Sequence, residues 1–267
     1  MLNLIQHGPV AEAVFSTRYT RAVGLRVSVF LHRGIAIDTG FARVADVLSA
    51  WVKTQRISGF VVTHWHEDHA GNLGWVVGRG IPVAVSADTL RRHRALTRVP
   101  LYRWSAWGHP DISRSDPEPA DHPFQLIPTP GHSADHVAVY DQDARTIFLG
   151  DLFLGTKAAT MLPDESPMEM VTSLKTVLAL EPKVAFDSHR GLLRDPLAML
   201  RAKADWLETT ISGVRAAHQA GRPDQVIVKE LLGGEERTAL VSFGQLCKRN
   251  FVRAVLADGR SRAILSE

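Results

Sequence analysis

The sequence contains a single cysteine, Cys247. No disulfide can therefore form within the chain, and a thiolate-rich zinc site is excluded. Any metal ion must be held by histidine and carboxylate side chains, which are plentiful: the 267 residues include 12 His and 28 Asp+Glu.

Long apolar runs are also absent. No stretch approaches the about 18 consecutive apolar residues of a membrane-spanning helix. The amino terminus lacks the basic start and apolar run of a secretory signal. We therefore expect a cytoplasmic protein that has no membrane partner.

A large excess of charge of either sign is missing too. The formal net charge is only +3, which does not by itself argue for a nucleic-acid partner. Hydrophobic residues make up 45% of the chain, and this content at this length supports a sizeable core. The composition indicates a globular protein.

The most informative segment is Phe60 to Asn72, where an apolar strand runs into a cluster of His64, His66, Asp68 and His69. Imidazole nitrogens and carboxylate oxygens are ligands for zinc and related metals. His64 and His66 point the same way on an extended chain, whereas Asp68 and His69 lie beyond a turn. This spacing favours one loop that binds two metal ions. The alternative is a solvated, His-rich loop that leads into a helix, with Asp68 as the helix cap.

Other apolar strands also end in polar residues. His132 follows the strand predicted at 124–127, Asp151 follows the strand at 146–149, and His189 follows the strand at 184–186. If the strands share one orientation, these side chains gather at the same edge of a sheet. Asp38, after the strand at 35–37, is either a hydrogen-bond partner of the metal loop or a plain turn aspartate.

The alternation of strands and helices predicts an α/β (α+β) fold. Helical spacing occurs at 43–53, 70–77 and 168–180, and then from 196 to about 220, at 224–232 and at 243–256. A soft boundary near Gly191 separates a catalytic domain, 1–191, from a helical carboxy-terminal extension, 192–267. Between Leu90 and Pro123 the pattern breaks up into a long basic and aromatic connection.

The order and spacing of these motifs resembles the metallo-β-lactamase superfamily, in particular its glyoxalase II-like hydrolases with a two-metal site. The resemblance covers roughly residues 20 to 195. It rests on Thr-His-x-His-x-Asp-His at 63–69, Thr-Pro-Gly-His at 129–132, Gly-Asp at 150–151 and the late His189. It implies a four-layer αββα sandwich of two similar halves.

The resemblance also implies a ligand set for two divalent ions. His64, His66 and His132 would hold the first ion, Asp68, His69 and His189 the second, and Asp151 would bridge both. Zn²⁺ is the expected metal, although these ligands also accept Fe or Mn. A hydroxide between the ions would attack the substrate, and Asp68 would also act in catalysis by orienting it. His136 is expected to support the site as a hydrogen-bond donor, or to be a core or turn histidine.

This sequence departs from the motifs of two groups within the superfamily, and each departure disfavours one function. Lactamases that use cysteine in the second metal site would need it at the position of Asp151, and another subclass lacks the bridging aspartate. Oxygen reductases of this fold have glutamate where this chain has His66, and no flavodoxin-like domain follows. Antibiotic hydrolysis and redox chemistry are therefore disfavoured.

Substrate contacts are expected from residues 91–107 and from the segments near Asp151 and His189. The candidates are Arg94, Tyr102, Trp104 and Trp107, with Phe153 on the floor of the site and Arg190 for an anionic group. A surface excursion and solvated arginines are the alternative. The other histidines, His7, His32, His93, His109, His122 and His218, are predicted to be surface residues.

We expect a hydrolase of ester-type bonds in small molecules, with thioesters or lactones favoured. A phosphodiesterase or ribonuclease on the same metals is the alternative. The basic residues Lys248, Arg249, Arg253, Arg260 and Arg262 keep nucleic acid open as a partner, but aromatic interleaving is scarce. A regulatory binding protein that retains the metal core is the third hypothesis, and the sequence leaves the oligomeric state open.

Overall fold

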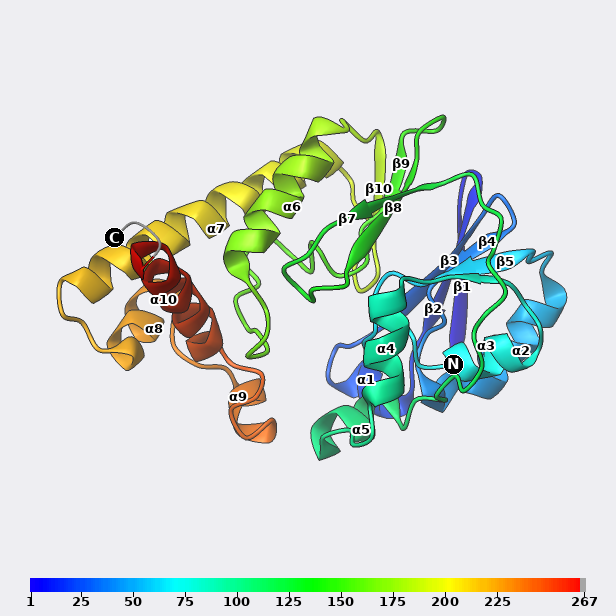
Figure 1. Cartoon of the computed structure of the whole chain (residues 1–267), viewed down its shortest axis with the longest axis horizontal. Coiled ribbons are helices and arrows are strands. Elements are labelled where there is room, and N and C mark those ends of the chain that lie inside the picture. Colours follow the sequence, from blue (N-terminus) through cyan, green and yellow to red (C-terminus); the bar gives the residue numbers. More distant parts are fainter. Residues whose placement is uncertain (265–267) are drawn as a thin grey trace. The chain divides into compact units, whose positions relative to one another are not determined.

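The computed structural model describes residues 1–264, with side chains described through residue 258. Arg260 and Arg262 of the basic carboxy-terminal segment lie outside the described side chains. The chain forms two compact units (Figure 1). The first consists of residues 1–128, 135–151 and 183–194, and the second of residues 129–134, 152–182 and the chain from Asp195 onward. The predicted boundary near Gly191 stays a prediction.

The first unit contains a six-stranded sheet in the order β1-β2-β3-β4-β5-β6. Its strands are β1 (Leu2–His7), β2 (Val10–Phe15), β3 (Val27–His32), β4 (Ile35–Ile37), β5 (Gly59–Val61) and β6 (Val83–Ala84). Strands β4, β5 and β6 run parallel. Because parallel strands end at the same edge, Asp38 and the loop after β5 begin side by side.

A five-stranded sheet, also in the first unit, has the order β11-β10-β9-β8-β7. Its strands are β7 (Gln125–Pro128), β8 (Val137–Asp141), β9 (Thr146–Phe148), β10 (Val184–Asp187) and β11 (Gly191–Leu192). Strands β9 and β10 are parallel neighbours. Asp151 follows β9 and His189 follows β10, so the parallel pairing brings these two residues to one edge.

Two hydrophobic cores hold the first unit together. One face of the first sheet packs against α2 (Ala45–Thr54) and α3 (Leu73–Gly78), with Leu48 and Trp51 among the buried residues. The other face packs on the second sheet through Phe30, Phe148 and Phe186, whose ring centroids lie 5.1 to 5.4 Å apart. The mixed α/β fold class with two sheets is confirmed.

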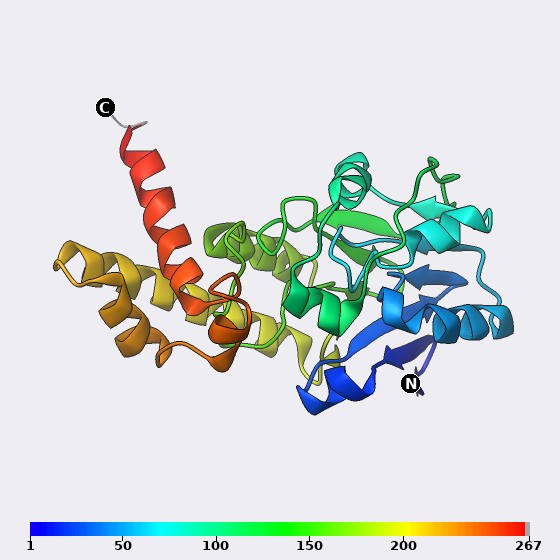
Figure 2. The same ribbon diagram turned by 90° about the horizontal axis from the view of Figure 1, so that it is seen from below.

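The second unit is helical and is seen from a second direction in Figure 2. It contains α6 (Pro167–Ala179), α7 (Pro196–Gln219), α8 (Asp224–Leu232), α9 (Arg237–Val241) and α10 (Lys248–Ile264). Ser166 and Asp195 cap α6 and α7 just before a proline, which is a common helix start. None of the described helices has the length and hydropathy of a membrane span.

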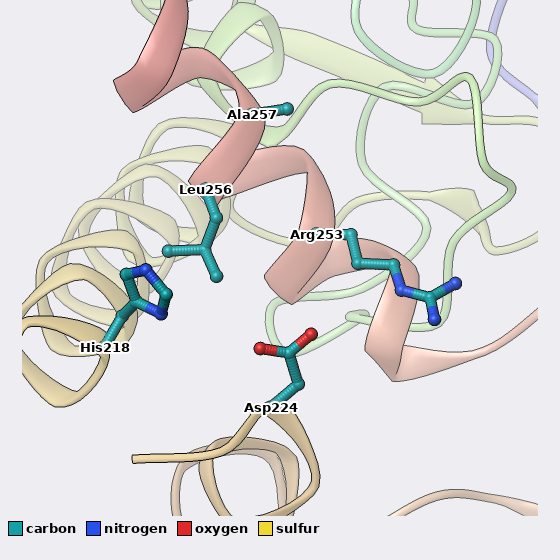
Figure 3. A pocket seen from close by; sticks show the side chains of 5 residues that line it. All are labelled: His218, Asp224, Arg253, Leu256 and Ala257. Carbon is teal, nitrogen blue, oxygen red and sulfur yellow. The ribbon is translucent and has the colours of Figure 1, made fainter. Parts of the chain in front are cut away.

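Helices α7, α8 and α10 surround a cavity of about 400 Å³ in the second unit (Figure 3). His218, Asp224, Arg253, Leu256 and Ala257 line it. His218 and Arg253 are exposed and Asp224 is half-buried, so water reaches these groups and screens their charges. The prediction that His218 is a surface residue is confirmed.

The structure has helices where the sequence predicts an irregular connection. Helix α4 spans Ala87–Ala95 and α5 spans Leu101–Trp107, while the first unit also contains α1 (Arg18–Ala22) and the short helix η1 (Ala42–Val44). Helix α4 buries only Thr89 and His93, so its sequence lacks an apolar stripe. Its start is nevertheless capped by Ser86, whose hydroxyl accepts from the N–H of Thr89.

The prediction that His32 and His93 lie on the surface is wrong, because both are buried. His32 Nε2 lies 2.7 Å from Asp141 Oδ2, and its ring stacks on Phe124. Burial raises the pKa of Asp141, but the N–H of Ala144, His32 and Arg33 outweigh it and lower that pKa overall. Burial lowers the pKa of His93. Both imidazoles therefore serve as core polar groups.

The remaining histidines without a predicted role lie nearer the surface. His109 is exposed, as predicted, whereas His7 and His122 are half-buried. His7 Nε2 lies 2.8 Å from Glu12 Oε2, and the ring of His122 stacks on Phe124. A neighbouring carboxylate or aromatic ring thus covers one side of each half-buried imidazole.

Candidate metal centre

Asp38 fixes the loop that follows β5. Its carboxylate accepts hydrogen bonds from Thr63 N at 2.8 Å, from the Thr63 hydroxyl at 2.9 Å and from His69 Nδ1 at 2.7 Å. The backbone of Asp38 has φ +66°, a left-handed conformation that costs about 1 to 3 kcal/mol for a residue other than glycine. The three hydrogen bonds offset this strain, and the loop is pinned to the end of the neighbouring strand.

The orientation of His64 follows from Thr63. The Thr63 hydroxyl donates to Asp38, so it accepts from His64 Nδ1, which lies 3.0 Å away. The Nε2 atom of His64 then faces His66 Nδ1 at 3.1 Å. Two nitrogens that bind one tetrahedral zinc ion at about 2.05 Å are about 3.3 Å apart. This pair therefore has the separation of two ligands of one ion.

A second group of potential ligands lies entirely within the first unit. Asp68, His69, Asp151 and His189 offer ligand atoms that all lie within 4.8 Å of one another. Asp151 Oδ1 is 3.2 Å from His69 Nε2, and Asp151 Oδ2 is 3.2 Å from His189 Nε2. Asp68 Oδ2 is 3.4 Å from His189 Nε2. Two buried carboxylates that converge with two imidazoles are a donor set for a divalent ion.

The electrostatics of this group point to the same conclusion. Burial raises the pKa of Asp151, but His189 and His69 outweigh it and hold the pKa well below its usual range. Burial lowers the pKa values of His69 and His189, but the neighbouring aspartates outweigh it and raise both well above the usual value. Without an ion, protons on the two imidazoles balance the carboxylates; a divalent ion can take their place.

Metal binding to the second group is therefore expected to release protons. Because the pKa values of His69 and His189 are raised, both rings are protonated at neutral pH in the metal-free protein, and an incoming ion displaces about two protons. Apparent affinity should rise with pH up to the raised pKa values. Titration of metal-free protein with Zn²⁺ in weakly buffered solution with a pH indicator measures this release. Binding without proton release contradicts the prediction.

His136 positions Asp151. Its Nε2 atom accepts a hydrogen bond from the backbone N–H of Asp151 at 3.0 Å. The preceding residue, Gly150, has φ +53°, and a Cβ there would lie 2.5 Å from His136 Nε2. Only glycine allows this approach, which gives the Gly-Asp pair a physical reason.

His132 belongs to the segment 129–134, which is part of the second unit. It is buried, and its Nδ1 atom lies 3.3 Å from Glu165 Oε2. A carboxylate beside one ring nitrogen orients the ring and raises its basicity as a ligand. The assignment of His132 to the first ion stays a prediction, and Glu165 is a supporting residue that the sequence did not indicate.

Helix α5 contacts residues of the metal loop. The guanidinium of Arg103 forms a buried ion pair with Glu67 and lies over the ring of Trp65. On the same face of the helix, the ring centroid of Trp107 is 6.4 Å from that of His189. The sequence indicated that residues 91–107 shape the site but contained no sign of the pair between Glu67 and Arg103.

The remaining substrate candidates have varied surroundings. Arg94 donates to the carbonyls of Ser113 and Ser115, and Arg43 lies 4.7 Å over the ring of Trp104. Tyr102 is half-buried and Arg190 exposed. Phe153, buried in the second unit, lies near Lys203 Nζ. The substrate contacts of Arg94, Tyr102, Trp104, Phe153 and Arg190 stay predictions.

Known proteins show similarity over most of the chain. A β-lactamase-like protein 2 homolog of Drosophila melanogaster is 26% identical over 189 residues, which cover 63% of this chain and 58% of that protein. An atrochrysone carboxyl ACP thioesterase of Aspergillus fumigatus is 26% identical over 231 residues, 84% of this chain and 48% of that protein. The chain therefore spans only about half the length of these relatives.

Solved structures support the fold. A metallo-β-lactamase family protein from Thermus thermophilus superposes with a TM-score of 0.63 at 16% identity, over 98% of this chain and 94% of that one. The model of the metallo-β-lactamase superfamily matches residues 34–205, which include every predicted ligand. The clusters of histidine and aspartate in this chain suit divalent metal ions, as expected for a superfamily of metal-dependent hydrolases. This chain belongs to the metallo-β-lactamase superfamily.

Proposed function

We propose that this protein is a two-metal hydrolase that cleaves thioesters or lactones, with Zn²⁺ as the preferred ion. The observation that carries the proposal is the position of Asp151. Its two carboxylate oxygens face His69 and His189 at equal distances of 3.2 Å, and the ring of His69 in turn lies beside that of His64. A carboxylate held in this way is suited to a centre that also contains a second ion.

The chain's own residues set the chemistry of this centre. Two divalent ions, when bound, lower the pKa of water to near neutrality and polarise a substrate carbonyl. Thr63 accepts from Nδ1 of His64 and Asp38 accepts from Nδ1 of His69, so in each neutral ring the Nε2 atom carries the lone pair that can bind a metal ion. Asp68 is placed next to His189, where its carboxylate can accept a proton from water and hold its orientation.

The proposed substrate class is supported first by the comparison with known proteins. The fungal relative named as an acyl-carrier-protein thioesterase aligns with 84% of this chain, and Asp151 stands where cysteine occurs in one class of lactamases. On helix α5, the ring of Trp107 lies beside that of His189 and is buried against Phe41.

A phosphodiesterase or ribonuclease remains the second candidate because of the basic α10. Part of that charge is paired with acidic residues of the chain itself: Lys248 Nζ lies 2.9 Å from Glu236 Oε1, and the carboxylate of Glu235 accepts from the backbone N–H groups of Lys248 and Arg249 at the start of the helix. We therefore favour a small-molecule substrate over nucleic acid. A regulatory binding protein, the third candidate, has no need of four converging ligands, three of them buried.

The proposal is tested by turnover of purified protein of known metal content. The panel pairs short-chain and aryl acyl thioesters and lactones with bis-aryl phosphodiesters and short RNA. We expect a chelator-sensitive rate on the thioesters or lactones, restored by added Zn²⁺. A rate on the phosphate substrates alone would reassign the protein as a phosphodiesterase, and no rate on either set, with metal bound, would favour the binding protein.

A further inference from the structure

The turn that carries His189 is docked on the residues that open β3. The backbone N–H of Ser28 donates to the carbonyl of Ser188 at 2.8 Å. Two residues earlier, Arg26 Nε donates to the carbonyl of His189 at 2.9 Å, and the same guanidinium also donates to the carbonyl of Arg190. One arginine side chain thus satisfies two consecutive carbonyls of the turn.

The backbone of Arg26 completes the contact in the other direction. Its carbonyl accepts a hydrogen bond from His189 Nδ1 at 2.7 Å. A carbonyl can only accept, so the proton of the neutral ring resides on Nδ1. In the neutral ring, which is the form that binds a metal ion, the lone pair is then on Nε2, the nitrogen that faces Asp151 and Asp68. Arg26 therefore holds the backbone of the turn with its side chain and sets the tautomer of the ring with its carbonyl.

Two further groups keep this turn close to β3. The carboxylate of Asp187 accepts from the N–H groups of His189 and Arg190 at 2.9 and 2.7 Å. Gly191 has φ +75°, and a Cβ there would lie 2.8 Å from Glu12 and 3.3 Å from Arg26. The chain passes between these side chains at a distance that only glycine permits. The turn therefore has little freedom to move without losing the contacts of Arg26.

We propose that Arg26 is a positioning residue for the second metal ion, acting by holding the His189 turn in place. This inference rests on the two-metal centre of the proposed function, and it assigns a role to a residue outside the ligand motifs. The contacts of the Arg26 side chain are with the turn of His189, a ligand of the second ion only. We therefore expect its effect on that ion rather than on both.

The charge of Arg26 and its hydrogen bonds to the turn predict opposite effects of Arg26→Met on the affinity for the second metal ion. Removing a cation next to a divalent site would by itself strengthen metal binding, because like charges repel. Removing the two hydrogen bonds lets the turn shift and misaligns His189. Loss of such supporting contacts weakens metal affinity by about 10- to 100-fold. We expect the weakening, confined to the second ion.

The experiment measures zinc content and affinity separately from turnover. Wild type, Arg26→Met and Arg26→Lys are loaded with Zn²⁺, dialysed, and analysed for metal per chain, and affinities are obtained by chelator competition. We expect two ions in wild type and one retained ion in Arg26→Met. Arg26→Lys keeps the charge but offers a single donor group, so its second ion should be held with intermediate affinity. Arg56→Met, at an exposed arginine, is the matched control.

The outcomes separate the inference from the proposed function. Tighter or unchanged binding of the second ion in Arg26→Met overturns the positioning role, and so does equal loss of both ions or a wild type that binds only one. If wild type binds two ions and Arg26→Met one, but neither hydrolyses thioesters or lactones, the proposed substrate fails while the role of Arg26 stands.

Discussion

Asp151→Asn is expected to lower turnover of a thioester or lactone by about a thousand-fold or more, which corresponds to about 4 kcal/mol of transition-state stabilisation. The amide keeps the size of the side chain but removes the charge that lies between His69 and His189. The carboxylate that balances the ions is lost, and an amide is a weaker ligand. The second ion should therefore bind poorly.

Metal content per chain and kcat/KM, measured on the same preparation, check this prediction. The fold should persist, because the backbone N–H of Asp151 still donates to His136. Asp143→Asn is the matched control, since Asp143 lies in an exposed hairpin turn where it pairs with Arg33. Turnover of Asp151→Asn at the level of this control would show that Asp151 has no part in holding the metals.

Most of the candidate ligands could be predicted because they follow the end of an apolar strand. A histidine or aspartate directly after a buried strand is visible in the sequence as a break in periodicity, and parallel pairing then brings the breaks together. Asp38, Asp151 and His189 all follow this rule in the structure. The same logic predicts the individual strands, since β-branched and aromatic runs mark buried strands. Their arrangement in two sheets was implied by the family resemblance.

The supporting residues could not be predicted because their partners are distant in the sequence. Arg26 lies 163 residues from His189, and nothing in its local pattern distinguishes it from a surface arginine. The pair between Glu67 and Arg103 depends on α5, a helix whose two tryptophans and one charged residue, Arg103, give no simple apolar stripe. The hairpin of β1 and β2 was also not predicted: several residues of β1 are exposed, so its apolar pattern is weak.

The ion pair between Glu67 and Arg103 leads to a second large effect, on stability. Arg103→Met is expected to lower the free energy of unfolding by about 3 to 5 kcal/mol, because it leaves a buried carboxylate without its cation. Glu67 and Arg103 are both largely buried, and the guanidinium is the main partner of Glu67. The double variant Glu67→Gln with Arg103→Met, which removes both charges, should recover most of the loss.

The stability of Arg103→Met is expected to fall as the pH rises. Burial raises the pKa of Glu67 above its usual value of 4.5, although Arg103 opposes the rise. Without Arg103 the pKa rises further, so the folded state of Arg103→Met binds a proton that the unfolded state has lost. The variant should be closest to wild type below pH 4.5 and lose stability as the pH rises toward the raised pKa.

Urea unfolding at fixed zinc concentration, repeated across pH, measures both effects. Arg91→Met is the control, because Arg91 forms an exposed pair with Asp88 on α4, and such pairs contribute about 1 kcal/mol or less. If Arg103→Met is as stable as this control, or if the double variant is no more stable than Arg103→Met, the ion pair does not hold α5 to the metal loop. The expected recovery in the double variant would instead show that the loop tolerates a neutral pair but not a lone charge. The position of Trp107 beside His189 would then depend on the balance of one buried pair.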